Sequence, residues 1–153
     1  MKLLFATLAV CVWTTAGGAQ TPAPAPAPAP VTKVLFFDHT KTAEAFAKGV
    51  ALVPAPDMIV QGSHRDAAGQ VEVHDKETDV IYVIDGAATF VTGGTMVGGK
   101  VSRPGQWLGT DITGGESHQL VKGDMIIVPA GTPHWFKVVP ASVSYYVVKV
   151  VKP

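Results

Sequence analysis

Turns containing glycine and proline divide the chain after residue 50 into short apolar segments, and this punctuation constrains the fold more than any other feature. Short runs rich in Val, Ile and aromatic residues, separated by such turns, are typical of β-sandwiches and closed barrels. Asp85-Gly86 is one such turn signal, and Gly93-Gly94 between two apolar runs is typical of a tight β-hairpin. We therefore predict an all-β domain with strands at residues 57–61, 71–74, 80–84, 88–92, 95–97, 107–112, 117–120, 125–128, 135–139 and 144–151.

One segment, ahead of these strands, fits a helix better than a strand. Thr40 can act as its N-cap, residues 43–48 favour a helix, and Gly49 can end it. We expect one short N-terminal helix.

Several predicted strands are apolar on both faces, notably 80–84, 125–128 and 145–151. A sheet with one face in water alternates apolar and polar residues instead. The outer face must therefore be covered by another sheet, by the N-terminal helix or by a second subunit, and we expect a homodimer.

The first 30 residues differ in character from the rest of the chain. Lys2 precedes an apolar run and a stretch of small residues, as in an export signal cleaved after Ala19. The apolar run is shorter than the roughly 20 residues of a membrane-spanning helix; an uncleaved anchor and a lipoprotein acylated at Cys11 are the alternatives. Alternating Pro and Ala then form an extended spacer. We expect a signal peptide at 1–19, a linker at 20–30 and one domain at 31–153. The chain would be exported, to the periplasm or the medium, with no membrane contact in its mature form.

Composition narrows the chemistry available to the domain. Cys11 is the only cysteine, so the mature chain would have no disulfide and no thiolate. Twelve basic and twelve acidic residues balance without a basic run, so we expect no nucleic-acid partner. There is also no phosphate-binding loop or Ser-His-Asp order. Any site must therefore use histidine, carboxylate, tyrosine, serine or lysine side chains.

Two segments concentrate such side chains. In the first, Glu72 and His74 are two residues apart on a strand and so point to the same face. Asp79 can return beside them at the start of the next antiparallel strand, while Lys76 and Glu77 are expected to be solvated in the loop between. In the second, glycines and prolines impose sharp turns before His134.

The second segment reproduces the second sequence motif of the cupin family. Gly123, Pro129, Gly131 and His134 stand at the spacing of that motif. The first segment resembles the first cupin motif, in which two histidines one residue apart precede a glutamate and, after six residues, a glycine.

His74 matches the second histidine of that first motif, and Gly86 matches its closing glycine. Glu72 stands where the first histidine usually is, and Asp79 where the glutamate usually is. The resemblance covers about residues 71–136. It implies a cupin-type double-stranded β-helix, a jelly-roll barrel.

The resemblance also implies one divalent metal ion bound inside the barrel. Its ligands would be the nitrogens of His74 and His134 and a carboxylate oxygen of Asp79, with Glu72 as a fourth ligand. Two imidazoles with carboxylates suit iron, manganese or zinc, and the second carboxylate disfavours copper. Asp79 is shorter than the usual glutamate, however. Both carboxylates could instead form a metal-free polar cluster that hydrogen-bonds a ligand.

Strand parity also predicts the surroundings of this site. Ile81, Val83 and Phe136 share the inward parity and should form an apolar pocket wall, whereas Tyr82 and Trp135 should lie outside it. We expect the remaining histidines to be solvated or packed elsewhere: His39, His64 and His118.

Three functions fit this sequence. The first is a metal-dependent enzyme of oxygenase, isomerase or lyase type acting on a small organic substrate, with Glu72 or Asp79 as general base if not bound to the metal. The second is a small-molecule sensor or carrier without catalysis. The third is a structural or storage module with a vestigial site, against which the retained ligand set argues. The fold alone does not choose between them, and the sequence names no catalytic residue.

Overall fold

The computed structural model describes residues 28–152, so the predicted signal peptide and most of the predicted linker lie outside the described residues. The described part contains one helix and twelve strands, with every strand pair antiparallel. The elements in chain order are α1 (His39–Lys48), β1 (Ala51–Pro54), β2 (Met58–Arg65), β3 (Val71–His74), β4 (Glu77–Thr92), β5 (Thr95–Val97), β6 (Lys100–Arg103), β7 (Gln106–Gly109), β8 (Asp111–Thr113), β9 (Glu116–Val121), β10 (Met125–Val128), β11 (His134–Val138) and β12 (Val143–Val151).

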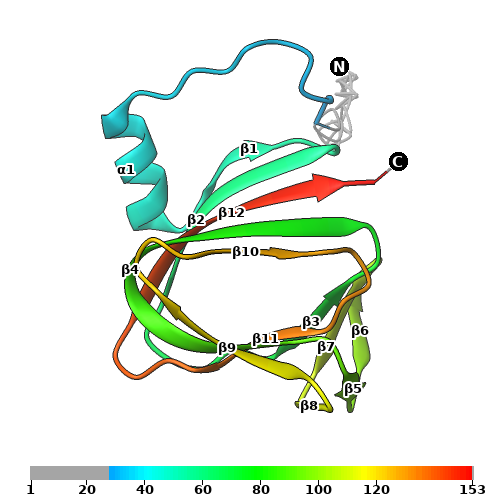
Figure 1. The fold of residues 1–153 in the computed structure, drawn as a ribbon. Helices are drawn as coiled ribbons and strands as arrows, with labels where there is room; N and C mark the ends of the chain where they lie inside the picture. Colours follow the sequence, from blue (N-terminus) through cyan, green and yellow to red (C-terminus); the bar gives the residue numbers. More distant parts are fainter. Residues whose placement is uncertain (1–27, 153) are drawn as a thin grey trace, which may run out of the picture.

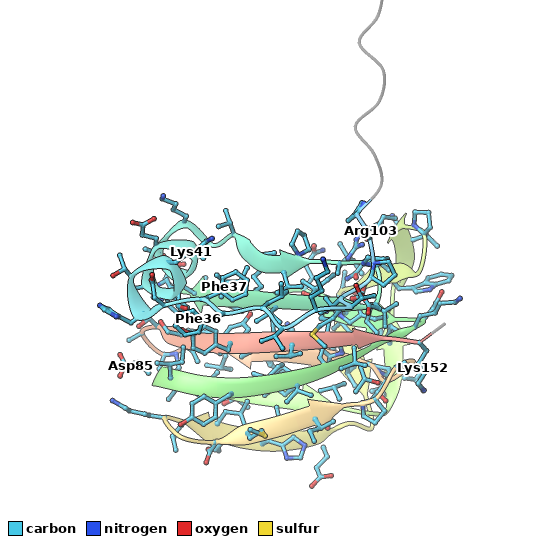
Figure 2. The ribbon with its side chains drawn as sticks, turned by 90° about the horizontal axis from the view of Figure 1, so that it is seen from above. Phe36, Phe37, Lys41, Asp85, Arg103 and Lys152 are labelled. Carbon is cyan, nitrogen blue, oxygen red and sulfur yellow. The ribbon has the colours of Figure 1, made fainter. Side chains whose placement is uncertain are left out.

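The strands form two facing layers of a curled sheet (Figure 1). The first layer contains β1, β2, β12, the first part of β4, and β10; the second contains the last part of β4, β9, β11, β3, β7 and β6. Figure 2 shows Asp85, in β4, and Lys152, just after β12, at opposite ends of the molecule. This architecture confirms the predicted all-β, cupin-type barrel with one short N-terminal helix.

Aromatic side chains fill the space between the layers. Phe90 is fully buried, and its ring meets that of Phe136 edge-on at 4.6 Å between centroids. Phe136 in turn stacks on Tyr145 at 4.7 Å. Such rings bury large apolar areas and gain further from this geometry. The packed rings form the floor of the site described below.

Helix α1 covers part of the outer face of the first layer. Its Phe46 ring lies edge-on to Tyr146 of β12, with centroids 5.6 Å apart, and a Cβ atom on Gly62 of β2 would collide with Phe46. The predicted helix is thus confirmed, and Gly49 ends it with a φ of 62°. The predicted cap is wrong: the carboxylate of Asp38, not Thr40, accepts the hydrogen bond from Lys41 N at 2.8 Å.

The predicted turn at Asp85-Gly86 does not separate two strands. The chain continues through it as the single strand β4, so this prediction is wrong. Gly86 has a φ of +78°, and the pairing of β4 with β12 shifts register nearby, between Ser144 and Tyr145. A local irregularity of this kind bends a strand without ending it. The bend lets β4 pass from the first layer to the second.

The predicted hairpin at Gly93-Gly94 is also wrong, although both residues have the positive φ of a tight turn. Thr92, at the end of β4, already pairs with Glu116 of β9 on one side and His134 of β11 on the other. The chain after the turn therefore has no free edge of β4 to return to, and β5 pairs with β8 instead.

Other strand boundaries follow the predictions closely or depart from them in small ways. The predicted strands 71–74, 95–97 and 125–128 are confirmed to the residue as β3, β5 and β10. The predicted strand 107–112 is two strands, β7 and β8, separated at Thr110, and strands β1 and β6 had not been predicted. Among residues 28–152, no helix is both long and apolar enough to cross a membrane.

Candidate metal centre

The structure brings all four predicted ligands to one place inside the barrel. Nε2 of His74 lies 3.5 Å from Oε2 of Glu72 and 3.4 Å from Oδ2 of Asp79. Nε2 of His134 lies 3.8 Å from the same Asp79 oxygen, and the two imidazole rings are 5.0 Å apart between centroids. His74, Asp79 and His134 are buried, with exposed fractions of 2%, 4% and 5%.

Backbone contacts between the two predicted motifs hold this arrangement. The N–H of Gly131 donates to the carbonyl oxygen of His74 at 2.8 Å, and His134 is the register partner of Glu72 in the β11–β3 pair. The sharp turn before His134 is therefore docked on the strand that carries the other histidine. Glu72 and His74 point to the same side, as their spacing on a strand predicted.

His134 has the protonation state that metal binding requires. Its Nδ1 lies 3.0 Å from the carbonyl oxygen of Thr132, so this nitrogen carries the proton and donates it. Nε2 is then the acceptor and faces Asp79. Burial lowers the pKa of His134 below its usual 6.5, against the opposing influence of Thr132 and Asp79, which keeps the ring neutral.

Lys149 is part of the site, which sequence reasoning missed. Its Nζ donates to Nε2 of His74 at 2.8 Å and lies 2.9 and 2.8 Å from Oδ1 and Oδ2 of Asp79. A signal for it was present: Lys149 is the only charge in the apolar strand β12 and shares the parity of buried Tyr145 and Val147. A lone lysine at an inward position of such a strand needs a buried partner.

The prediction that Glu77 is a solvated loop residue is wrong. Glu77 opens β4, and its side chain is only 16% exposed. Its Oε2 lies 3.1 Å from Lys149 Nζ and 3.6 Å from Nδ1 of His74. The same two-residue spacing that aligns Glu72 with His74 also aligns Glu77 with Asp79, and this signal could have found it.

Burial and neighbouring charge act in opposite directions on Asp79. Burial raises the pKa of this carboxyl group, but the adjacent His74 ring and the Lys149 ammonium outweigh it and hold the pKa below 3.8. Asp79 is therefore a carboxylate at neutral pH.

A cavity of about 160 Å³ opens beside these groups. Ile81 and Phe136 line it, as predicted, whereas buried Val83 does not. Trp135 also lines it, contrary to the prediction, because its indole N–H reaches across to the carbonyl oxygen of Gly69 at 2.7 Å. The full lining is Gln61, Ser63, Arg65, Gln70, Glu72, Asp79, Ile81, His134, Trp135, Phe136, Tyr145, Val147 and Lys149.

A family model described as Cupin matches residues 63–153, which is more than half of the chain. The chain belongs to the cupin family. No curated protein sequence matches this cupin.

Solved structures similar to this cupin share little of its sequence. A protein from Bacillus halodurans is 14% identical, covers 67% of this chain and 69% of its own, and has a TM-score of 0.49. KdgF from a Halomonas species is 17% identical over 67% of this chain and 76% of its own, with a TM-score of 0.48. Procruciferin, an 11S globulin from Brassica napus, is 13% identical over 62% of this chain, with a TM-score of 0.45; the chain spans only 21% of that globulin. These likenesses say nothing about activity.

The donor atoms of this cupin fit a divalent cation. Two sets of three donors each lie within 4.8 Å of one another: Glu72 with both histidines, and His74 with Glu77 and Asp79. Imidazole nitrogens and carboxylate oxygens together suit iron, manganese and zinc. His74 belongs to both sets, so it is the central donor of the site.

The three other histidines lie away from the cavity. His39 is exposed at the start of α1, and exposed His64 contacts the hydroxyl of Ser144 at 2.8 Å. His118 is half-buried against Thr92, with 2.9 Å between Nε2 and the hydroxyl oxygen. None of the three lines the cavity.

Proposed function

We propose that this cupin binds one divalent metal ion, of iron, manganese or zinc, through His74, His134 and Asp79, with Glu72 as a further ligand. The observation that carries the proposal is the orientation of the two rings. In each ring Nε2 is the acceptor nitrogen and faces buried carboxylates. Metal-binding histidines usually donate their other N–H to a carbonyl or carboxylate, as His134 does to Thr132.

Elemental analysis of the protein, purified without a histidine tag and without added metal, tests this proposal. We expect close to one equivalent of a transition metal. His74→Ala and His134→Ala should lose it, whereas the matched control His39→Ala should keep it. Equal metal content in all three variants would contradict the assignment.

The cavity beside the ion favours a small organic ligand with an anionic group. Nε of Arg65 donates to the hydroxyl of Tyr145 at 2.9 Å, and its guanidinium lies 5.0 Å over the Phe136 ring. These contacts hold a positive charge at the cavity wall, where Glu72, at 3.5 Å, is its ion-pair partner. An arginine held in this way suits bidentate binding of a carboxylate.

Two functions use this site: catalysis on the bound molecule, and binding alone as a sensor or carrier. When bound, a divalent ion supplies a Lewis acid or activates water or dioxygen. Where Glu72 is not bound to the ion, its carboxylate lines the cavity and takes up a proton from the ligand. Dioxygen uptake or product formation with candidate carboxylic acids would identify an enzyme; saturable binding without turnover would identify a binder.

We also propose that this cupin is exported and forms a homodimer. Export is supported by the composition of residues 1–19. The dimer is supported by an apolar area on the outer face of the first layer that α1 leaves uncovered. Tyr82, Met125 and Ile127 are exposed there, and Met125 is the register partner of Tyr82.

A further inference from the structure

The ammonium group of Lys149 is a cation, and it is already bound by side chains that were predicted to bind the metal ion. Its Nζ lies 2.8 Å from Nε2 of His74 and 2.8 Å from Oδ2 of Asp79, and 3.1 Å from Oε2 of Glu77. An ammonium has three N–H donors and no acceptor. Its three hydrogen bonds go to His74 Nε2 and to the two oxygens of Asp79, and Glu77 adds an ion pair.

The hydrogen bond between Lys149 and His74 uses the atom that a metal ion needs. A neutral imidazole has one acceptor nitrogen, and at His74 it is Nε2, because a lysine ammonium can only donate to it. The proton of His74 is then on Nδ1, toward Glu77. One lone pair serves one partner, so His74 cannot accept from Lys149 and bind a metal ion at the same time.

The distances to Asp79 lead to the same conclusion. Nε2 of His74 and Oδ2 of Asp79 are 3.4 Å apart, and Lys149 Nζ is 2.8 Å from each. A zinc ion about 2.1 Å from both atoms would then lie within about 3.5 Å of the ammonium nitrogen, whatever its direction of approach. A dication and an ammonium at that separation repel strongly in a buried site.

We propose that Lys149 is a built-in competitor for the metal site of this cupin. Its ammonium holds the buried ligands in place, and a divalent ion binds only by displacing it. This inference rests on the metal-binding function proposed above. Displacement has room to occur, because Lys149 lines the cavity and its side chain is a flexible four-carbon stem. Competition of this kind weakens metal binding. The ligand atoms are available to a metal ion only when the ammonium of Lys149 has moved away from them.

Metal titration of the wild-type protein and of Lys149→Met tests the proposal. Methionine keeps most of the side-chain volume and removes the charge. Lys122→Met, at an exposed lysine in the turn between β9 and β10, is the matched control for the loss of one positive charge. Each protein is first stripped with a chelator and then titrated calorimetrically with Zn²⁺ alone and with Co²⁺ alone.

We expect Lys149→Met to bind both ions at least about tenfold more tightly than the wild-type protein, the equivalent of about 1.4 kcal/mol. Lys122→Met should bind like the wild type. In the presence of chelator, Lys149→Met should unfold at a lower temperature, because the carboxylates of Glu77 and Asp79 then remain without their ammonium partner. Added Zn²⁺ should raise its midpoint by more than it raises that of the wild type.

Two results would overturn the proposal in distinguishable ways. If the wild-type protein binds metal and Lys149→Met binds no more tightly, Lys149 is not a competitor, while the metal site itself stands. If neither folded protein binds either ion, the proposed metal function fails, and the competition fails with it.

A second pair of variants covers the case in which Lys149→Met does not fold. Glu77→Gln combined with Lys149→Met removes one negative and one positive charge, so the net charge of the site is unchanged. The matched control is Glu77→Gln alone. We expect the double variant to bind Zn²⁺ at least about tenfold more tightly than this control; equal affinities would overturn the proposal.

Discussion

Single side chains in this cupin take their properties from burial and from their nearest partners. His134 is an example: the ring is buried, and its Nδ1–H is held by the carbonyl oxygen of Thr132, so the neutral form is favoured. In the unfolded chain the same ring is solvated and takes up a proton at its ordinary pKa of 6.5. The difference between the two states couples folding to pH at this one residue.

We predict that the metal-free protein loses stability as the pH falls below 6.5, in part through His134. Because the folded pKa is lowered, the unfolded chain binds the proton first, so acidification favours unfolding. The contribution of neutral His134 to the free energy of unfolding is fully present above pH 6.5. It is lost as the pH falls through the lowered pKa that His134 has in the folded protein. Urea denaturation at several pH values, in the presence of chelator, measures this effect. As the pH falls, the free energy of unfolding should decrease less in His134→Gln than in the wild-type protein.

The control for this prediction is His118→Gln, which removes a half-buried histidine outside the cavity. It should keep the pH dependence of the wild type. An unchanged slope in His134→Gln between pH 7.5 and 5.5 would show that this ring does not link folding to pH.

At the scale of elements, glycine positions decide how neighbouring segments pack. Gly86 lets β4 bend between the layers, and the carbonyl of Ser142 lies where its Cβ would be. Gly62 lets α1 approach β2 so closely that Phe46 occupies the space of a side chain. Local sequence shows that these residues are glycines, but not which segment approaches each of them.

We predict that Gly62→Val detaches α1 from the sheet. The added side chain would collide with Phe46, and overpacking of this kind costs about 1–3 kcal/mol. The free energy of unfolding from urea denaturation should fall by that amount, and residues 39–48 should become sensitive to limited proteolysis. In a Phe46→Ala background the same substitution should cost less, because the collision is relieved. Equal costs in both backgrounds would show that the helix does not pack on Gly62.

At the scale of the whole molecule, α1 covers only part of the outer face of the first layer. The helix lies against β1 and β2, and its Phe46 meets Tyr146 of β12 (Figure 1). Met125 and Ile127, on β10, have exposed fractions of 62% and 60%. The apolar outer face of the first layer is therefore covered in one region by the N-terminal helix. A second subunit is the covering proposed for the region around Met125 and Ile127.

We predict that the protein sediments as a dimer and that Met125→Glu combined with Ile127→Glu converts it to a monomer. Carboxylates buried without partners at an interface oppose association. The matched control is Val101→Glu, at an exposed position of β6. Analytical ultracentrifugation distinguishes the outcomes: a monomeric wild type, or a double variant that remains dimeric, would contradict this interface.

The sequence by itself determined the features that depend on local spacing. Strand parity aligned Glu72 with His74, and the turns around Gly131 predicted the presentation of His134, because side-chain direction in a strand follows from neighbouring residues alone. The cupin motifs then predicted the barrel. Local spacing failed at Gly93-Gly94, where the turn formed but the pairing partner of β5 was decided by which strand edges were already occupied.

Only the tertiary structure decided which cation lies among the predicted ligands. Lys149 is 70 residues from Asp79 in sequence and belongs to a strand outside both motifs, yet its ammonium contacts both oxygens of that carboxylate. No local pattern places these residues together, because their contact depends on β12 pairing beside the start of β4. Lys149 at the centre of the site is therefore a property of the closed sheet, since long-range pairing alone sets which inward side chains meet.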